Sequence, residues 1–201
     1  MARTSSLLTD IPLFPLATVL FPGGPLELRI FEPRYLDLVR ECTRGDKYFG
    51  VCLILGGEEV GGPAAPAAVG TLARITDFFT TSEGILGIAA EGGRRFRVNQ
   101  VRIRSDGQLR GDVACWTDVP VVPLPPEFGL LETILRRLVE QMAPSWKDAP
   151  ETCYDDAVWV GFRLAELLPL DTGERQHLLE MTDPMERLGW LRDVLPRFQR
   201  N

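Results

Sequence analysis

The chain has 201 residues, of which 45% are hydrophobic, 25% charged and 8% aromatic, and this composition excludes a disordered, collagenous or low-complexity protein. The formal net charge of −6 argues against general binding to nucleic acid or to an anionic membrane, because neutralising phosphates takes a surplus of Lys and Arg. No run approaches the ~18 apolar residues of a membrane span. The segment around Pro12 makes a poor signal peptide, since Asp10 and Pro12 interrupt it. We therefore expect a soluble, cytoplasmic protein with no membrane partner.

Several catalytic and metal-binding signatures are missing from the sequence. A phosphate-binding loop needs a Gly-Lys pair, but Lys47 follows Asp46 and Lys147 follows Trp146. His177 is the only histidine and the four cysteines are widely spaced, so we expect no metal site, no cofactor and no disulfide framework. None of the five serines lies in a glycine-rich or strained turn that would activate a nucleophile. These absences predict a protein that is not an enzyme.

The first 118 residues read as a β-rich domain with one helix. Residues 11–16 have the pattern of a strand whose prolines are typical of a sheet edge, and residues 26–30 alternate as a second strand. Pro33 suits the first position of a helix with one apolar stripe. The next segments are a buried strand over 48–55, a surface loop rich in Gly and Pro over 56–68, and two hairpins. These hairpins pair 72–79 with 85–90 and 94–104 with 109–116.

The strand over 94–104 contains a conflict of side-chain parity. Phe96 and Val98 share one face, whereas Val101 and Ile103 share the other. A regular strand cannot bury all four, because each face repeats every two residues. A one-residue bulge near Asn99 resolves the conflict and is common where a sheet curls into a barrel. The set that then points outward is Arg95, Arg97, Arg102 and Arg104.

From residue 119 onward the chain reads as a proline-rich linker, 119–126, followed by a bundle of about four helices. Residues 131–142 have a wide apolar face, and residues 155–168 are apolar almost all round, as expected of a central helix. The narrow polar stripe on this central helix is Asp156, Arg163 and Glu166. Two further helices begin at Asp171 and Asp183, each an N-cap followed by Glu three residues later. Trp159 lies one turn before Arg163, which predicts a cation–π packing contact.

Six segments resemble, in the same order, the N-terminal substrate-binding domain of Lon proteases. They are residues 11–16 (IPLFPL), 20–23 (LFPG), 28–35 (LRIFEPRY), 45–51 (GDKYFGV), 69–75 (VGTLARI) and 91–98 (EGGRRFRV). The resemblance spans about residues 10–117. The helical tail, including 159–170 (WVGFRLAELLPL), is similar to stand-alone bacterial members that have neither an ATPase nor a protease module.

This resemblance implies an α+β protein with a PUA-like β pseudo-barrel over residues 1–118 and a helical bundle over 119–201. It also implies a non-catalytic role in which the protein binds polypeptide segments or a partner protein, as an adaptor or accessory in protein quality control. There are no family catalytic residues to carry over. Binding would use extended, partly apolar segments, either added to a sheet edge or laid in a cleft between barrel and bundle. The oligomeric state is left open.

The candidate peptide-binding residues are Phe31, Glu32, Arg34, Tyr35, Phe78 and Phe79. A structural reading competes at the first four: Phe31 and Tyr35 pack the helix against the barrel, while Glu32 pairs with Arg34. Phe78 and Phe79 are adjacent in a strand and point to opposite faces, so one ring should lie in the core and the other against the helices, a partner or solvent. An exposed ring beside a groove is the kind of surface that binds unfolded chain.

The arginine row Arg95, Arg97, Arg102 and Arg104 supports an alternative function as an RNA-binding module, because PUA-like barrels in other families bind RNA. The competing explanation is a solvated face opposed by the excess of carboxylates in this chain. The row lacks the interleaved aromatic residues that base stacking requires. The sequence therefore favours polypeptide over RNA as the partner.

Overall fold

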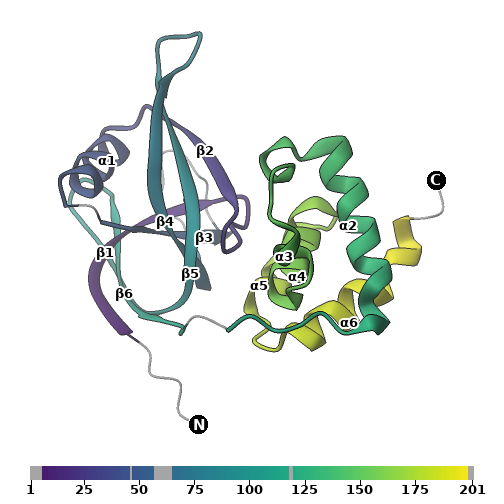
Figure 1. Ribbon diagram of the computed structural model, residues 1–201. Helices are drawn as coiled ribbons and strands as arrows, with labels where there is room; N and C mark the ends of the chain where they lie inside the picture. Colours follow the sequence, from purple (N-terminus) through teal and green to yellow (C-terminus); the bar gives the residue numbers. More distant parts are fainter. Residues whose placement is uncertain (1–5, 46, 57–64, 118–119, 199–201) are drawn as a thin grey trace. The chain divides into compact units, whose positions relative to one another are not determined.

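The computed structural model describes residues 6–45, 47–56, 65–117 and 120–198 (Figure 1). The chain divides into two compact units, Met1–Asp118 and Val119–Asn201. Most of the predicted loop over 56–68, residues 57–64, lies outside the described residues. In the part of the chain that is described, no helix is both long and apolar enough to span a bilayer.

The first unit is a six-stranded sheet with one helix. Its elements are β1 (Ser6–Leu16), β2 (Pro25–Ile30), α1 (Pro33–Gly45), β3 (Phe49–Gly56), β4 (Ala65–Thr80), β5 (Leu86–Ile103) and β6 (Leu109–Cys115). The strand order is β2-β5-β4-β3-β1-β6, and an additional β5–β6 pairing joins the ends of the sheet into a barrel with β2 attached outside. All pairings are antiparallel except the parallel pairing of β1 with β3. The α+β class and the curved sheet are confirmed.

β1 lies inside the sheet, so the prediction of an edge strand is wrong. It pairs with β6 over Ser6–Leu13 and with β3 over Leu13–Leu16, and the two pairings overlap only at Leu13. Each half of β1 therefore has one unpaired side, where a residue without an N–H group costs no ladder hydrogen bond. This staggered pairing is how an interior strand accommodates Pro12 and Pro15.

β5 is one continuous strand of 18 residues, although the sequence predicted two separate strands with a break near Gly92. At Gly92 the strand meets the turn that precedes β2. The N–H of Gly92 donates to the carbonyl of Gly24 at 2.8 Å, and the N–H of Gly23 donates to the carbonyl of Gly92 at 2.7 Å. A Cβ atom on Gly92 would lie 2.2 Å from the carbonyl oxygen of Phe21. The glycine therefore permits a close approach of two backbones and does not mark a turn.

The predicted bulge in β5 is present, because the register with β6 shifts between Val98 and Gln100. Beyond it Val101 and Ile103 pair with Gly111 and Leu109 and so share the inward face, as expected. They are nevertheless 38% and 59% exposed, so the expectation that they are buried is wrong. Parity sets the face of a residue, but it does not determine how much of that face other segments cover.

Two hydrophobic clusters fill the first unit, one on each face of the strands. The cluster that includes Phe14 contains the apolar stripe of α1, and a separate cluster contains Leu13 and Phe96. Leu13 and Phe14 are neighbours in β1 and point to opposite faces. The predicted α1 stripe is confirmed, and its buried residues are Tyr35, Leu38, Val39 and Cys42.

The second unit is helical, as predicted. Its elements are η1 (Pro126–Phe128), α2 (Gly129–Met142), η2 (Pro144–Trp146), α3 (Glu151–Tyr154), α4 (Ala157–Leu167), α5 (Thr172–Glu180), α6 (Pro184–Val194) and η3 (Leu195–Phe198). Asp171 and Glu174 form the predicted capping box at α5, and the Asp183 carboxylate accepts the N–H of Met185 at α6. The described part of the proline-rich segment is held to the start of α4, since Leu124 N–H donates to the Asp155 carbonyl at 2.8 Å.

Arg163 on α4 is completely buried, and the prediction of a polar stripe there is wrong. Its guanidinium lies 4.3 Å from the ring centre of Trp146 and 3.1 Å from the Glu166 carboxylate. Trp159 makes edge contacts with Trp146 and Tyr154, and the ring beneath the Arg163 guanidinium is that of Trp146. A buried charge needs an opposite charge or a ring close to it; Glu166 supplies the charge from α4 itself, and Trp146 supplies the ring from η2.

Candidate functional site

The start of α1 carries the most distinctive motif of the sequence, FEPRY at residues 31–35. Tyr35 is buried, and its ring stacks on Phe14 with 4.0 Å between centroids and an interplanar angle of 11°. The predicted pair of Glu32 and Arg34 is present at 2.8 Å. Both side chains are largely covered, with exposed fractions of 17% and 11%. Tyr35 and the Glu32–Arg34 ion pair thus have the structural roles that the sequence indicated as the alternative to peptide binding.

Three phenylalanine rings of the first unit are exposed: Phe31 by 55%, Phe78 by 46% and Phe79 by 37%. Two expectations fail here, because Phe31 does not pack the helix against the barrel and neither Phe78 nor Phe79 enters the core. Phe78 and Phe79 lie near the end of β4, in the hairpin that β4 forms with β5 (Figure 1), opposite Ile88 and Gly87 of β5. The Phe79 ring covers Gly87, on which a Cβ atom would lie 2.2 Å from it. Phe31 follows β2, whereas Phe78 and Phe79 lie on β4. Because β2 and β4 pair with opposite sides of β5, exposed aromatic rings lie on both sides of that strand.

The predicted outward row of arginines is interrupted at Arg95. This side chain is only 5% exposed, and its guanidinium lies 4.4 Å from the ring centre of Trp116. The tryptophan follows the last strand and covers an arginine that strand parity alone places on the outer face. Arg97 is exposed, as expected.

The two remaining arginines of the row are matched by carboxylates. Arg102 donates two hydrogen bonds to Asp112, at 2.8 and 2.6 Å, and lowers the pKa of that carboxyl to about 2. Arg104 lies 3.7 Å from Asp106. A row that is partly buried and partly neutralised is a poor surface for phosphate groups, since RNA binding requires cations that are available to the ligand.

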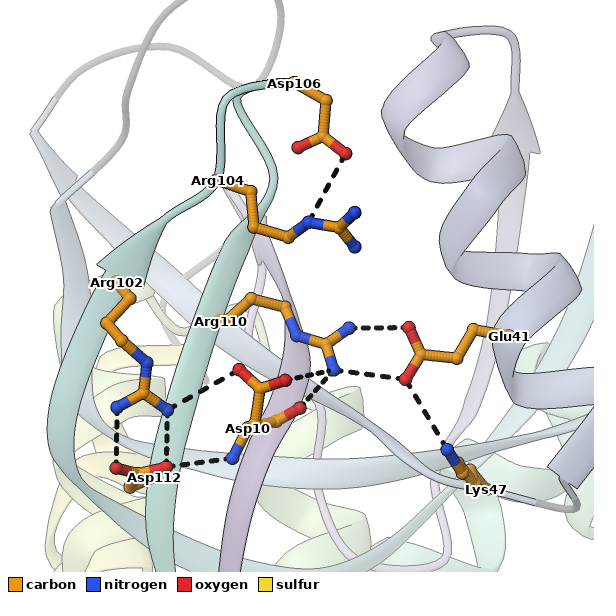
Figure 2. A network of polar contacts seen from close by, with 8 residues as sticks. All are labelled: Asp10, Glu41, Lys47, Arg102, Arg104, Asp106, Arg110 and Asp112. Carbon is orange, nitrogen blue, oxygen red and sulfur yellow. Dashed lines mark hydrogen bonds and ion pairs between the residues drawn. The ribbon is translucent and has the colours of Figure 1, made fainter.

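An extended polar network in the first unit centres on Arg110 of β6 (Figure 2). Its side chain is 7% exposed and reaches Glu41 of α1, with hydrogen bonds of 2.6 and 3.1 Å. It also donates to the Asp10 carboxylate at 2.9 Å and to the Asp10 main-chain carbonyl. Lys47 lies 3.7 Å from Glu41. Hydrogen bonds from Arg110 lower the pKa values of both carboxyls, Asp10 and Glu41, despite partial desolvation.

Asp10 has an unusual backbone conformation for a residue within a strand. Its φ angle is +53°, in the left-handed region that residues other than glycine rarely adopt. The β1–β6 register shifts between Leu8 and Ile11 at this point. The Asp10 N–H donates to Asp112 at 2.8 Å and the Asp10 carbonyl accepts from Arg110, so two side chains of β6 hold the kink in place. Such strained positions are concentrated at binding and catalytic sites.

This network lies beside a groove of ≈ 610 Å³. One side of the groove is the first half of β1, and the other contains Glu41 of α1 and the residues just before β3. Its lining is Leu7, Leu8, Thr9, Asp10, Ile11, Pro12, Glu41, Lys47, Tyr48 and Arg110. Leu7 is 61% and Tyr48 41% exposed, which gives the groove apolar surface that solvent reaches.

The chemistry of the described residues contains no obvious reactive centre. Among these residues no group of three or more His, Cys, Asp or Glu side chains is placed to hold a metal ion. Cys42, Cys52 and Cys115 are buried free thiols, and burial raises the pKa of Cys42 to about 11 and that of Cys52 to about 12. These thiols remain protonated near neutral pH, which is the opposite of what a nucleophile needs. His177 is exposed beside Trp190.

The fold and the sequence together define a substrate-binding domain of the Lon type. The family model for the ATP-dependent protease La (LON) substrate-binding domain matches residues 10–197, and the chain belongs to this family. The match includes the helical unit, and so extends further than the 10–117 range that carried the sequence resemblance.

Known proteins of similar sequence and structure agree with this assignment. The crystal structure of a Lon N-terminal domain protein from Xanthomonas campestris is 45% identical, has a TM-score of 0.78, and is matched over 92% of this chain and 98% of that one. The Lon protease of Cytophaga hutchinsonii is 24% identical over 93% of this chain, which spans 24% of that protein's length. Protein cereblon of Danio rerio is 33% identical over 49% of this chain and 23% of its own length.

The groove beside β1 is a feature that the residue pattern did not predict. Asp10 stood out only as a polar interruption of an apolar segment, and Arg110 and Glu41 are 69 residues apart. One signal was available: a proline within a strand pattern indicates a sheet edge or a bulge, and Pro12 follows Asp10 by two residues. The residues that contact that bulge depend on which strand lies beside β1 in the sheet, and this is β6, the last of the described strands.

Proposed function

We propose that this protein binds extended or unfolded polypeptide segments without cutting them, and acts as an adaptor or accessory in protein quality control. The observation that carries the proposal is membership of the Lon substrate-binding domain family over residues 10–197. The exposed apolar side chains of the first unit support it. Those of Phe31, Phe78 and Phe79 provide one such surface and the groove beside β1 provides another.

The RNA-binding alternative receives less support from the arrangement of charges. Arg95 is buried, and Arg102 and Arg104 lie beside carboxylates of the same unit. RNA binding depends on releasing counterions from phosphates, so it requires cations that are not already neutralised.

The test is a direct binding measurement with the full chain and two probes. The first is fluorescein-labelled lysozyme that has been reduced and carboxymethylated, so that it cannot refold, and the second is a labelled single-stranded RNA. We expect fluorescence anisotropy to show binding of the polypeptide that changes little with added salt, and mass spectrometry to show that it stays intact. Cleavage of the polypeptide would contradict the proposed function, and so would RNA binding with a steep salt dependence and no polypeptide binding.

A further inference from the structure

The first half of β1 presents an unpaired edge to the groove. β6 pairs with one side of Ser6–Leu13, but the β3 pairing on the other side begins only at Leu13. In an antiparallel pair, alternate residues direct their N–H and C=O groups away from the partner strand. Among the described residues no strand occupies that side between Ser6 and Pro12.

The groove separates this edge from the rest of the barrel. β3 begins only beside Leu13. The residues before β3, Lys47 and Tyr48, follow α1 in the chain and do not run alongside the first half of β1 as a strand. The resulting space of ≈ 610 Å³ falls within the range of about 300–1,000 Å³ that is typical of ligand pockets. An extended backbone in this space would lie where β3 is missing.

The walls of the groove combine apolar side chains with charges that are already paired. Leu7 and Tyr48 offer exposed apolar surface. The carboxylates of Asp10 and Glu41 share the guanidinium of Arg110, so neither acts as an isolated anion toward a carbonyl-rich backbone. This lining fits a partly apolar segment and provides no surplus charge for a phosphate chain.

The kink at Asp10 fixes the course of β1 beside the groove. Its left-handed backbone is held by Arg110 and Asp112 from β6. A regular β1 would follow the register of β6 through Thr9 and Asp10, but the shift takes these residues out of the ladder. The edge is therefore pre-formed, which reduces the conformational entropy lost when a ligand strand is added.

We infer that an extended polypeptide segment of another protein binds in this groove by adding a strand to the free edge of β1 over Ser6–Pro12. Main-chain hydrogen bonds to β1 supply affinity for any sequence. They exclude the backbone groups of Asp10, which already bond Asp112 and Arg110, and Pro12 has no N–H to donate. Contacts with Leu7 and Tyr48 favour apolar side chains at alternate positions. The inference rests on the proposed function and assigns it a site. It differs from binding through the exposed rings of Phe31, Phe78 and Phe79.

The test measures binding of the labelled, carboxymethylated lysozyme to the wild-type chain and to four full-length variants. Leu7→Asp and Tyr48→Asp place a charge in the groove, and each should raise Kd about tenfold, because an apolar contact of this size contributes that order of affinity. Leu55→Asp is the matched control: Leu55 is 68% exposed on β3 and does not line the groove, so its Kd should equal that of the wild type. Phe79→Ser probes the rival aromatic surface and should have little effect.

Amide hydrogen exchange gives a second readout that is specific for strand addition. Binding of the probe to the wild-type chain should slow exchange in residues 6–11 and leave β2 unchanged. If the probe binds but only Phe79→Ser weakens it, or if protection appears at β2, the site is wrong and the proposed function stands. If the wild-type chain binds no probe, the proposed function fails as well. If sedimentation shows a dimer that Leu7→Asp dissociates and the probe cannot displace, the occupant is a second copy of this chain and the inference is overturned.

Discussion

Replacing Arg110 by methionine should destabilise the first unit more than any other single loss of charge in its sheet. Arg110 donates two hydrogen bonds to Glu41 and two to Asp10, and its side chain is 7% exposed. Methionine keeps the unbranched apolar stem that packs beneath the guanidinium. The substitution therefore removes the charge and its hydrogen bonds with little change in volume.

The expected loss is about 2–3 kcal/mol of unfolding free energy. Breaking a fully buried ion pair costs about 3–5 kcal/mol, because the remaining charge stays desolvated. Here the remaining carboxylates regain water, since the Asp10 side chain is 60% and the Glu41 side chain 29% exposed. The expected loss of about 2–3 kcal/mol is therefore smaller than that for a fully buried pair. It corresponds to one bidentate, charge-assisted contact, which contributes about 1.5–3 kcal/mol.

The measurement is urea unfolding followed by hydrogen exchange in segments of each unit. Exchange in β3 reports the first unit and exchange in α4 reports the second, so the second unit is an internal control. A loss of this size moves the β3 midpoint by about 1 M urea. Arg97→Met is the matched control, because Arg97 is exposed on the same sheet. Equal midpoints for the two variants would refute the reasoning.

The same variant should also change the response to acid. Arg110 holds the pKa values of Asp10 and Glu41 below their ordinary values of 3.8 and 4.5. A carboxyl with a lowered pKa in the folded state stabilises the protein above its unfolded pKa, and this contribution disappears as the pH falls through the folded pKa. Between about pH 5 and pH 3 the wild type should therefore lose more stability than Arg110→Met. Parallel curves would show that Arg110 does not set these pKa values.

Three further substitution or labelling experiments test other parts of the structure. Asp10→Gly should be about 1 kcal/mol more stable than Asp10→Ala in urea unfolding, because both lose the same ion pairs and only alanine retains the strain of the positive φ angle; equal stability would show that there is no strain. Gly70→Ala should cost about 2–4 kcal/mol, since its Cβ would lie 2.3 Å from a carbonyl oxygen of β3, whereas Gly56→Ala has no atom within 4 Å and should be near neutral; similar midpoints would contradict this packing. Iodoacetamide at pH 8 should modify the half-buried Cys153 before the three buried thiols, whose pKa values burial raises; uniform labelling detected by mass spectrometry would contradict that burial.

Local patterns were sufficient to predict much of the fold. The apolar stripe of α1, the bulge in β5, the capping box at Asp171 and the central helix of the second unit all depend on residues within a few positions of one another. Periodicity, capping and turn chemistry act over that range, so they can be read from the chain alone. The FEPRY motif and its neighbouring segments likewise predicted the family.

Several features of the structure depend on contacts between distant residues, and the predictions failed there. β1 was expected at a sheet edge because of its prolines, but staggered pairing with β3 and β6 places it inside the sheet. Arg95 and Arg163 were expected on polar faces, but Trp116 and Trp146 bury them. Phe31, Phe78 and Phe79 are 55%, 46% and 37% exposed, although the sequence pattern placed Phe31 and one ring of the Phe78–Phe79 pair against the core.

What the amino-acid sequence determined by itself is the identity of the local elements, the α+β class and membership of the Lon substrate-binding family. Only the tertiary structure decided which side chains solvent reaches, and that β1 borders a groove with one unpaired side. The physical reason is that burial and strand pairing depend on which segments meet in space. Arg110 binds a helix residue 69 positions earlier and a strand residue 100 positions earlier, and no pattern within either segment contains that information.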